Sequence, residues 1–328
     1  MEFTGMIKKK IVIIGTAYPF RGGLAAFNER LAQQFIDSGH QVDLITFTVQ
    51  YPEFLFPGKS QYSEDPAPPL NIKRWIHSFN PINWFIAGIK IRKLKADIII
   101  CKYWLPLLGP CFGTILWLVK RKQTTIISVL DNIIPHEHRP GDELFTRFFV
   151  SMVDRFIYMS HEVGKDLKKF VPRKMATYVP HPIYDHFGKE VSRPDAIHHL
   201  KLNDDTRYVL FFGFIRDYKG LDLLYDAIGL LKAQLPQVKF IIAGEYYTDP
   251  APYEKQIQSL AIEDKLIVRT NFISNEEVKF YFSACDVVVQ PYKTATQSGI
   301  AQIALHFTKA AIVTKVGGLH EMVQDDKT

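Results

Sequence analysis

Short apolar segments alternate with segments of helix length along this chain, and the alternation runs twice. In the first half the apolar segments span 10–15, 41–48, 96–101, 124–130, 155–160 and 176–180. In the second half they span 207–213, 238–244, 265–270, 286–291 and 310–316. Segments that are apolar at nearly every position are typical of strands covered by helices on both faces. The pattern therefore predicts an α/β protein with two doubly wound parallel-sheet domains.

The stretch between the two halves predicts the domain boundary. Residues 184–207 are polar and show no regular period, which is typical of a linker, so we expect domains at 1–190 and 191–328. A chain of 328 residues is also longer than one hydrophobic core usually serves. Ligands of doubly wound sheets bind beyond the carboxyl ends of the strands, so we expect a site in a cleft between the domains.

The sequence also suggests how its ends and its most apolar stretch behave. MEFTG (1–5) reads as a non-native extension before a start at Met6, and it is no signal peptide. The chain stops just after a strand, so we expect the second domain to be truncated at its C-terminal end. Residues 104–119 are strongly apolar but contain Pro106 and Pro110, which favours packing on a sheet over spanning a membrane.

Cysteine usage and charge indicate compartment and partners. Cys101, Cys111 and Cys285 are far apart and form no CxxC pair, which favours a reducing cytoplasm over a disulfide or zinc framework. Residues 1–190 hold 25 Lys and Arg against 17 Asp and Glu, whereas the remainder holds 15 against 17. This asymmetry predicts an anionic partner for the first half, a membrane surface or phosphorylated lipid rather than nucleic acid. The expected location is the cytoplasm, at the inner face of the membrane.

The stretch 211–224, FFGFIRDYKGLDLL, places two cations where they need an anion. Gly213 ends an apolar strand, and Arg216 and Lys219 follow immediately before an amphipathic helix. The N-terminus of a helix already carries partial positive charge, so cations there are unfavourable unless an anion joins them. A diphosphate would satisfy both side chains, although solvated surface cations are the ordinary alternative.

Two loops of the first half carry further candidate residues. Gly22 and Gly23 precede the first helix, where the absence of side chains lets a ligand approach backbone N–H groups. The loop after the strand 124–130 is polar, with Asp131, Asn132 and His136. The HEH triplet 136–138 matches no common metal-site spacing, so we expect no metal.

The loop that follows the strand 286–291 runs into a helix. The side chains of Gln297 and Ser298, and the backbone N–H groups of Gly299 and Ile300, could bind hydroxyls or phosphate. The alternative is that Gln297 and Ser298 only cap the helix, as Ser commonly does.

In order and spacing, four features together resemble glycosyltransferase family 4, which has the GT-B fold of two Rossmann-like domains. They are the Gly22-Gly23 loop, the turn from Gly213 to Gly220, the loop at Gln297 and the closing VGGLHEMV at 316–323. The resemblance covers nearly the whole chain. It implies transfer of a sugar from a nucleotide-sugar donor with retention of configuration and without metal, the donor on the second domain and the acceptor on the first.

The resemblance also implies roles for individual residues. Lys219 matches the family lysine that binds the donor diphosphate, and Arg216 replaces an arginine that the family places where Phe214 stands. Asp131 falls where many members have a histidine near the transferred sugar. Gln297 and Ala304 stand near the positions of two family glutamates. The implied sets are therefore Arg216, Lys219 and Asp131 for catalysis; Gly22, Gly23, Gly213, Glu245, Gln297, Ser298, Gly299 and Ile300 for the donor; and Asn132 and His136 on the acceptor side.

These inferences converge on a retaining glycosyltransferase that needs no cofactor. Its donor is a nucleoside-diphosphate sugar and its acceptor a saccharide or a lipid-linked saccharide, in surface glycan or polysaccharide synthesis. Two alternatives stay open. One is a catalytically silent subunit that binds a sugar nucleotide or a glycan, and the other is a sugar-nucleotide epimerase of the same fold.

Overall fold

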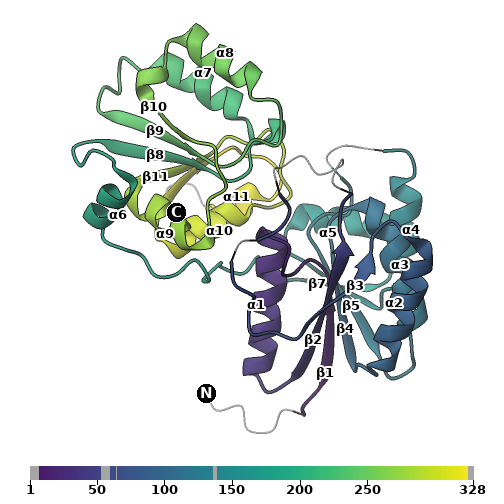
Figure 1. Ribbon diagram of the computed structural model, residues 1–328. Coiled ribbons are helices and arrows are strands. Elements are labelled where there is room, and N and C mark those ends of the chain that lie inside the picture. The colour runs from purple at the N-terminus through teal and green to yellow at the C-terminus, as the bar shows by residue number, and fades with distance from the viewer. Residues whose placement is uncertain (1–6, 53–59, 64, 136–138, 324–328) are drawn as a thin grey trace. The chain divides into compact units, whose positions relative to one another are not determined.

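The computed structural model describes residues 7–52, 60–63, 65–135 and 139–323, and the chain divides into two compact units. The first unit is Met1–Pro180 and the second is His181–Thr328. The sequence had suggested a boundary at 190/191. Each unit holds its own parallel sheet and its own buried core (Figure 1), and each is described by itself below.

The first unit is built on a seven-stranded sheet in the order β3-β2-β1-β4-β5-β6-β7. Its strands, all in parallel pairs, are β1 (Lys10–Ile14), β2 (Gln41–Val49), β3 (Ile72–His77), β4 (Ile98–Tyr103), β5 (Thr125–Leu130), β6 (Arg155–Tyr158) and β7 (Met175–Tyr178). The central strands β1 and β4 are buried along almost their whole length. Their apolar side chains therefore face helices on both sides of the sheet.

The helices of the first unit are α1 (Gly23–Asp37), α2 (Pro81–Lys93), α3 (Gly109–Val119), α4 (Asp142–Met152) and α5 (His161–Phe170), with a 3-10 turn η2 (Pro106–Leu108) before α3. α1 covers one face of the sheet, and α2, α3 and α4 form a layer on the opposite face (Figure 1). α3 is apolar almost throughout and buries most of its residues between α2 and α4. The apolar stretch 104–119 thus packs within the fold, as expected.

The second unit holds a five-stranded parallel sheet in the order β10-β9-β8-β11-β12. Its strands are β8 (Arg207–Phe212), β9 (Val238–Ala243), β10 (Leu266–Arg269), β11 (Val287–Gln290) and β12 (Ala310–Val313). The helices are α6 (Arg193–Leu200), α7 (Leu221–Leu231), α8 (Ala251–Leu260), α9 (Asn275–Ala284), α10 (Gly299–His306) and α11 (Leu319–Met322), with 3-10 turns η3 (Asp217–Lys219) and η4 (Glu263–Lys265). α7 and α8 lie on one face of the sheet, and α9 and α10 lie on the other (Figure 1).

The structure confirms the predicted alternation and corrects it at two places, α6 in the linker and β3 at the edge of the first sheet. Each predicted apolar segment forms a strand, but the linker 184–207 is not irregular throughout, because α6 occupies 193–200. The Ser192 side chain caps this helix by accepting from the Asp195 N–H at 3.2 Å. Ala196 and Ile197 are buried where α6 packs on α9. With only two buried apolar residues, α6 has too weak a periodicity to be recognised in the sequence.

Strand β3 was not predicted. Its sequence, IKRWIH, buries one residue fully and exposes Arg74, because it lies at the edge of the sheet. Edge strands lack the continuous apolar character that identifies central ones. No helix within the described ranges is long and apolar enough to cross a membrane.

Gly220, in the second unit, packs closely against the loop that follows β11. Gly220 has φ +66°, and a Cβ atom there would collide with the carbonyl oxygen of Pro291. Gly188 also has positive φ, +83°, but a Cβ there would meet only the Lys279 side chain, at 3.7 Å. Gly220→Ala should lower the unfolding free energy by about 3 kcal/mol, and Gly188→Ala by about 1 kcal/mol. Urea unfolding measures both, and equal effects would contradict the close packing of Gly220 on Pro291.

Candidate functional site

In the second unit, residues from two separate loops meet at the carboxyl end of β8. Gly213 has φ +95°, a backbone conformation that favours glycine. A Cβ atom at Gly213 would lie 3.1 Å from the Nζ of Lys219 and 3.2 Å from the Cδ1 of Ile300, at the start of α10. The structure therefore brings Ile300, from a separately predicted loop, against Gly213 and Lys219, and it leaves little room for a side chain at Gly213.

The ammonium of Lys219 is buried without a compensating carboxylate. The residue is 8% exposed, and within the described part of the chain no acid pairs with it. Its Nζ lies 5.6 Å from the centre of the Tyr292 ring, which supplies only a weak cation–π attraction. Burial, and to a smaller extent the positive charge of Arg216, together lower the pKa of Lys219 to about 7. An uncompensated buried cation is unfavourable, so this position is adapted to receive an anion.

Arg216 lies on the exposed side of the same turn. Its guanidinium carbon is 5.0 Å from the centre of the Tyr247 ring, and that ring stacks on Phe214 at 4.2 Å. The aromatic pair holds the guanidinium group beside the loop without neutralising it. Phe214 thus packs on the same Tyr247 ring beside which Arg216 lies.

Ser298 occupies the N-cap position of α10, but its hydroxyl makes no capping bond. It donates instead to the Oε1 of Gln290 at 2.6 Å, and both residues are buried. The alternative expectation, that Ser298 only caps the helix, is therefore wrong. The Nε2 of Gln290 is buried, and no acceptor in the described ranges lies within hydrogen-bonding distance of it. Buried donors usually have an acceptor, so the unsatisfied Nε2 of Gln290 suggests that a polar group is missing near Ser298.

The remaining candidates of the second unit lie at the same edge of the sheet. Glu245 follows β9, is 3% exposed and accepts the Ile215 N–H at 2.8 Å through its backbone carbonyl. Gln297 is partly buried and directly precedes Ser298. Gly299 begins α10 over the ring of Tyr184, where a Cβ would lie 2.8 Å from the ring. The first N–H groups of α10 have no partner within the helix and face the same edge.

In the first unit, the loop after β1 is held in place by three side chains. Thr46 accepts the Ala17 N–H at 3.0 Å, Glu29 accepts the Tyr18 N–H at 2.6 Å, and Asn28 donates to the Thr16 carbonyl at 2.9 Å. Burial raises the pKa of Glu29. The loop ends at Gly22, whose φ of +101° and ψ of 176° are accessible almost only to glycine. Gly22 and Gly23 therefore present backbone rather than side chains at the start of α1.

A buried ion pair that the sequence analysis missed lies near these glycines. Lys102, in β4, is 2% exposed, and its Nζ lies 2.8 Å from the Oδ1 of Asp131. The same Nζ lies 3.3 Å from the centre of the Phe27 ring, on α1. Burial lowers the pKa of Lys102, and the carboxylate of Asp131 opposes that shift. A lysine in the otherwise apolar strand IIICKY (98–103) is a signal that could have indicated a buried charge, although it does not identify the partner.

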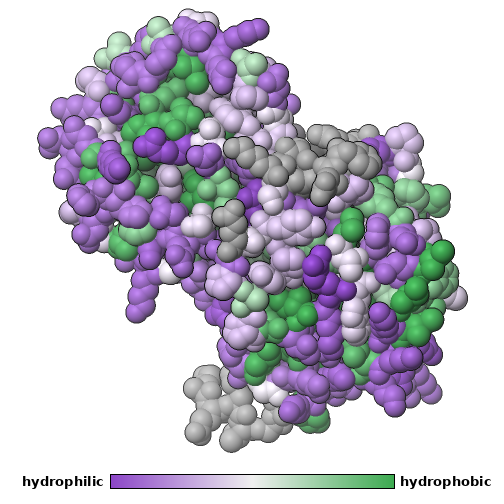
Figure 2. Space-filling view, viewed as in Figure 1, coloured by the Kyte–Doolittle hydropathy of each residue, from purple (hydrophilic) through white to green (hydrophobic). Residues whose placement is uncertain are grey.

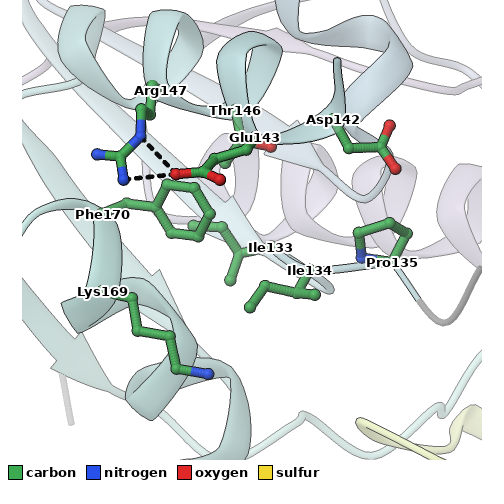
Figure 3. A pocket seen from close by; sticks show the side chains of 9 residues that line it. All are labelled: Ile133, Ile134, Pro135, Asp142, Glu143, Thr146, Arg147, Lys169 and Phe170. Carbon is green, nitrogen blue, oxygen red and sulfur yellow. Dashed lines mark hydrogen bonds and ion pairs between the residues drawn. The ribbon is translucent and has the colours of Figure 1, made fainter. Parts of the chain in front are cut away.

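The first unit also contains a pocket, and the acceptor-side candidates are not among the residues that line it. Asn132 is partly buried, and His136 lies outside the described residues. The pocket has a volume of about 240 Å³ and none of the predicted site residues lines it. Figure 3 shows its lining, Ile133, Ile134, Pro135, Asp142, Glu143, Thr146, Arg147, Lys169 and Phe170. Arg147 pairs with Glu143 at 2.7 Å and Lys169 with Asp166 at 2.6 Å, so its cations are compensated, unlike Lys219.

No group of three or more His, Cys, Asp or Glu side chains that could hold a metal ion gathers in the described part of the chain. His136, Glu137 and His138, which the sequence analysis had weighed, lie outside the described residues.

Comparisons of sequence place both halves among glycosyltransferases. The model for Glycosyltransferase Family 4 matches residues 21–186, and the model for Glycosyl transferases group 1 matches residues 192–328. An uncharacterized glycosyltransferase of Methanocaldococcus jannaschii is 24% identical over 340 residues, which cover 97% of this chain and 83% of that protein. One from Bacillus subtilis is 23% identical over 199 residues, 59% of this chain and only half of that protein.

Comparison of structures identifies the architecture. Anabaena HepE, solved in complex with UDP-glucose, superposes with a TM-score of 0.72 at 16% identity, over 97% of this chain and 83% of that one. This likeness shows the GT-B fold, in agreement with the two parallel-sheet units.

The Lys102–Asp131 pair can be tested through stability. Lys102→Met removes the cation and leaves the Asp131 carboxylate without its buried partner, which should lower the unfolding free energy by about 3–5 kcal/mol. Lys102→Met combined with Asp131→Asn removes both charges and should recover much of that loss. Denaturant unfolding of the two single variants and the double variant gives the coupling energy. Additive effects would show that the two charges do not depend on each other.

Proposed function

Because this chain belongs to glycosyltransferase family 4, we propose that it transfers a sugar with retention of configuration from a nucleoside-diphosphate sugar to a saccharide or lipid-linked acceptor. The observation that carries the proposal is the buried ammonium of Lys219, beside which no carboxylate lies in the part of the chain that the structure describes. A diphosphate supplies the missing negative charge at the carboxyl end of a parallel sheet, where such folds bind ligands. UDP-glucose, with which HepE was solved in complex, is of this chemical class.

The donor diphosphate would be held by charge and by backbone groups together. Lys219 supplies a buried positive charge, Arg216 an exposed one, and the N–H groups of Gly299 and Ile300 the positive end of α10. The close contact between Gly213 and Lys219 keeps the ammonium at the strand end. Glu245 and Gln297 would contact hydroxyls of the sugar or the ribose.

The Ser298–Gln290 pair suggests how Ser298 reaches the phosphate. If the Gln290 carboxamide turns over, its NH₂ group donates to the Ser298 oxygen, and the buried donor no longer lacks a partner. The Ser298 proton is then released to donate toward a phosphate oxygen. Binding of the anion would thus complete a hydrogen-bond arrangement that is incomplete without it.

The proposed reaction needs no dedicated strong base. The bond between the anomeric carbon and the diphosphate oxygen breaks while the acceptor hydroxyl forms its bond to the same carbon from the same face. The hydroxyl proton passes to the departing phosphate oxygen, so nucleoside diphosphate is released. Lys219, Arg216 and the α10 N–H groups stabilise the charge that develops on the leaving group, and one such contact is worth about 10²–10³ in rate. No metal is required in this scheme.

The first unit would hold the acceptor. Asp131 stands where many family members have a histidine, and Lys102 fixes its carboxylate from within the sheet. Gly22 and Gly23 would approach the donor phosphates, and Asn132 and His136 would contact the acceptor. The net positive charge of residues 1–190 suits an anionic, lipid-linked acceptor at the cytoplasmic face of a membrane, as in surface glycan or polysaccharide synthesis. The three cysteines are buried and free, which suits a reducing compartment.

A catalytically silent binding subunit is a second candidate, and one observation favours it. Gln297 and Ala304 stand near the positions of the two family glutamates, and Ala304 is fully buried in α10, where it can contact no sugar. Release of nucleoside diphosphate from the donor, measured with and without acceptor, separates the two candidates. A subunit that only binds would release none.

Substitution of Lys219 tests the diphosphate site. Lys219→Met should weaken binding of UDP or GDP at least tenfold in calorimetry while leaving the fold at least as stable, because an uncompensated buried charge is removed. Lys265 is the matched control: it is also 8% exposed in the second unit, but its Nζ donates to the carbonyls of Leu235 and Pro236. Lys265→Met should lower stability and leave nucleotide binding unchanged. Unaltered affinity of Lys219→Met for every nucleoside diphosphate would contradict the proposal.

Because the pKa of Lys219 is lowered, the protein's affinity for a nucleoside diphosphate should depend on pH. In the free protein this lysine loses its proton as the pH rises through about 7, and a bound anion raises its pKa again. Between these two pKa values, binding takes up a proton, and affinity should fall by up to about tenfold per pH unit. Calorimetry in buffers of different ionisation enthalpy measures the uptake. If Lys219→Met takes up as many protons on binding as the wild type does, the proton uptake belongs to another group.

Gln297 gives a test of donor recognition. If its amide contacts the donor sugar, Gln297→Ala should slow transfer roughly tenfold or more while the melting temperature stays nearly the same. Product formation from a panel of nucleotide sugars is the measurement. A folded Gln297→Ala protein with wild-type turnover would remove Gln297 from the site.

A further inference from the structure

One face of α2 is apolar yet exposed. Ile82 is 74% exposed, and Phe85, Ile86 and Ile89 are 47%, 46% and 48% exposed. With about 3.6 residues per turn, these four side chains fall on one side of the helix. The opposite side, with Ala87, Gly88 and Ile91, is buried against the fold. A helix that is apolar on both sides needs a second partner on its outer face.

Cations border this apolar stripe. Lys90 and Arg92 are exposed on its two flanks, and Lys93 lies at its C-terminal end. In the described ranges, no carboxylate pairs with Lys90 or Lys93. The sequence around α2 is depleted of acids: between Asp65 and Asp131 it contains one, Asp97. The same stretch holds ten cations, Lys73, Arg74, Lys90, Arg92, Lys93, Lys95, Lys102, Lys120, Arg121 and Lys122.

The end of α3 extends the same surface. The guanidinium of Arg92 donates to the carbonyls of Leu118 at 2.6 Å and Lys120 at 3.2 Å, so α2 and the end of α3 are joined directly. Trp117 is 56% exposed beside this junction. Lys120 pairs with Asp154, whereas Lys122 stays exposed without an acid within the described part of the chain. In Figure 2, apolar residues reach the surface among hydrophilic ones at the edge of the first unit where α2 and α3 lie.

We propose that this surface, defined by Ile82, Phe85, Ile86, Ile89 and Trp117 with Lys90, Lys93 and Lys122 around them, docks on a bilayer that contains anionic lipid. Apolar side chains would enter the boundary between head groups and acyl chains, and the lysines would contact lipid phosphates.

A lipid surface fits these observations better than a second copy of the chain. A symmetric contact places each surface against itself, and the unpaired lysines of both copies would then face one another without acids between them. An anionic bilayer offers both the apolar and the anionic component over a flat area. Bulky apolar and aromatic side chains with lysines at their edge are the composition of helices that lie in a membrane interface.

This inference rests on the proposed function. It adds the surface that would bring the first unit to a lipid-linked acceptor. The two can fail separately, because vesicle binding is measured without donor or acceptor. A protein that binds vesicles but transfers no sugar leaves the docking surface intact, and an active transferase that ignores vesicles overturns it.

The experiment is co-sedimentation with vesicles of phosphatidylcholine alone or mixed in equal parts with phosphatidylglycerol. The wild type should bind the anionic vesicles at low salt and lose that binding as salt is added. Lys90→Gln with Lys93→Gln should reduce the partition coefficient about 25-fold, about fivefold for each cation. Phe85→Ser with Ile89→Ser should reduce it roughly tenfold or more.

Matched substitutions in the second unit provide the controls. Leu230 is 80% exposed on α7, and Lys239 and Lys255 are exposed, so Leu230→Ser and the pair Lys239→Gln with Lys255→Gln remove similar groups elsewhere. These variants should bind like the wild type, and thermal melting should show that all variants are folded. Three results would overturn the proposal: equal binding to both vesicle types, equal loss in the control variants, or a dimer in light scattering that the α2 substitutions dissociate.

Discussion

Within the described residues no carboxylate lies beside the positive charge of Lys219, and the turn between β8 and α7 and the start of α10 surround that charge. The lysine stem crosses the turn between β8 and α7, which Gly213 and Gly220 make narrow enough to place the ammonium at the strand end. Ile300 closes the other side, at the start of a helix whose own dipole is positive. Two positive elements therefore face the same space. Such an arrangement is stable at neutral pH either because the lysine sheds its proton or because an anion binds.

Lys102 and Lys219, the buried lysines at the carboxyl edges of the two sheets, differ in whether an acid compensates their charge. Lys102 already has its anion, since Asp131 lies 2.8 Å away, so its charge is used within the first unit to fix a carboxylate. Lys219 has no such partner among the described residues, so its charge is available to a ligand. Both follow from the parallel sheet, which gathers the loops of every strand at one edge. The same fold thus provides a fixed carboxylate in one unit and an open cation site in the other.

Strands such as β1 and β8 could be predicted because both faces of the strand are covered, so that the residues after the first cation are nearly all apolar. A short run of adjacent apolar residues is typical of such a strand. Prediction failed where one face is open: β3 at the sheet edge and α6, with two buried residues, show almost no period. Among the candidate site residues, Lys219, Gly213 and Gly22 could be selected from the sequence because they stand in loops between a strand and a helix, and their role in binding stays a prediction. Lys102 was overlooked because a lysine within an apolar strand gives no indication of its partner 29 residues away, across the sheet in Asp131.

The sequence by itself determined the two α/β units, the family and the loops that carry the candidate residues, because strand burial and glycine positions are local properties. Tertiary structure alone decided which charges are compensated. Ser298 bonds to Gln290 rather than capping α10, Lys102 meets Asp131, and Lys219 meets no acid in the described ranges. Likewise, only packing reveals that α2 buries Ile91 and exposes Phe85, two residues of equal apolar character. A charge or an apolar side chain acquires its role from what lies within a few ångströms, and those neighbours come from distant parts of the chain.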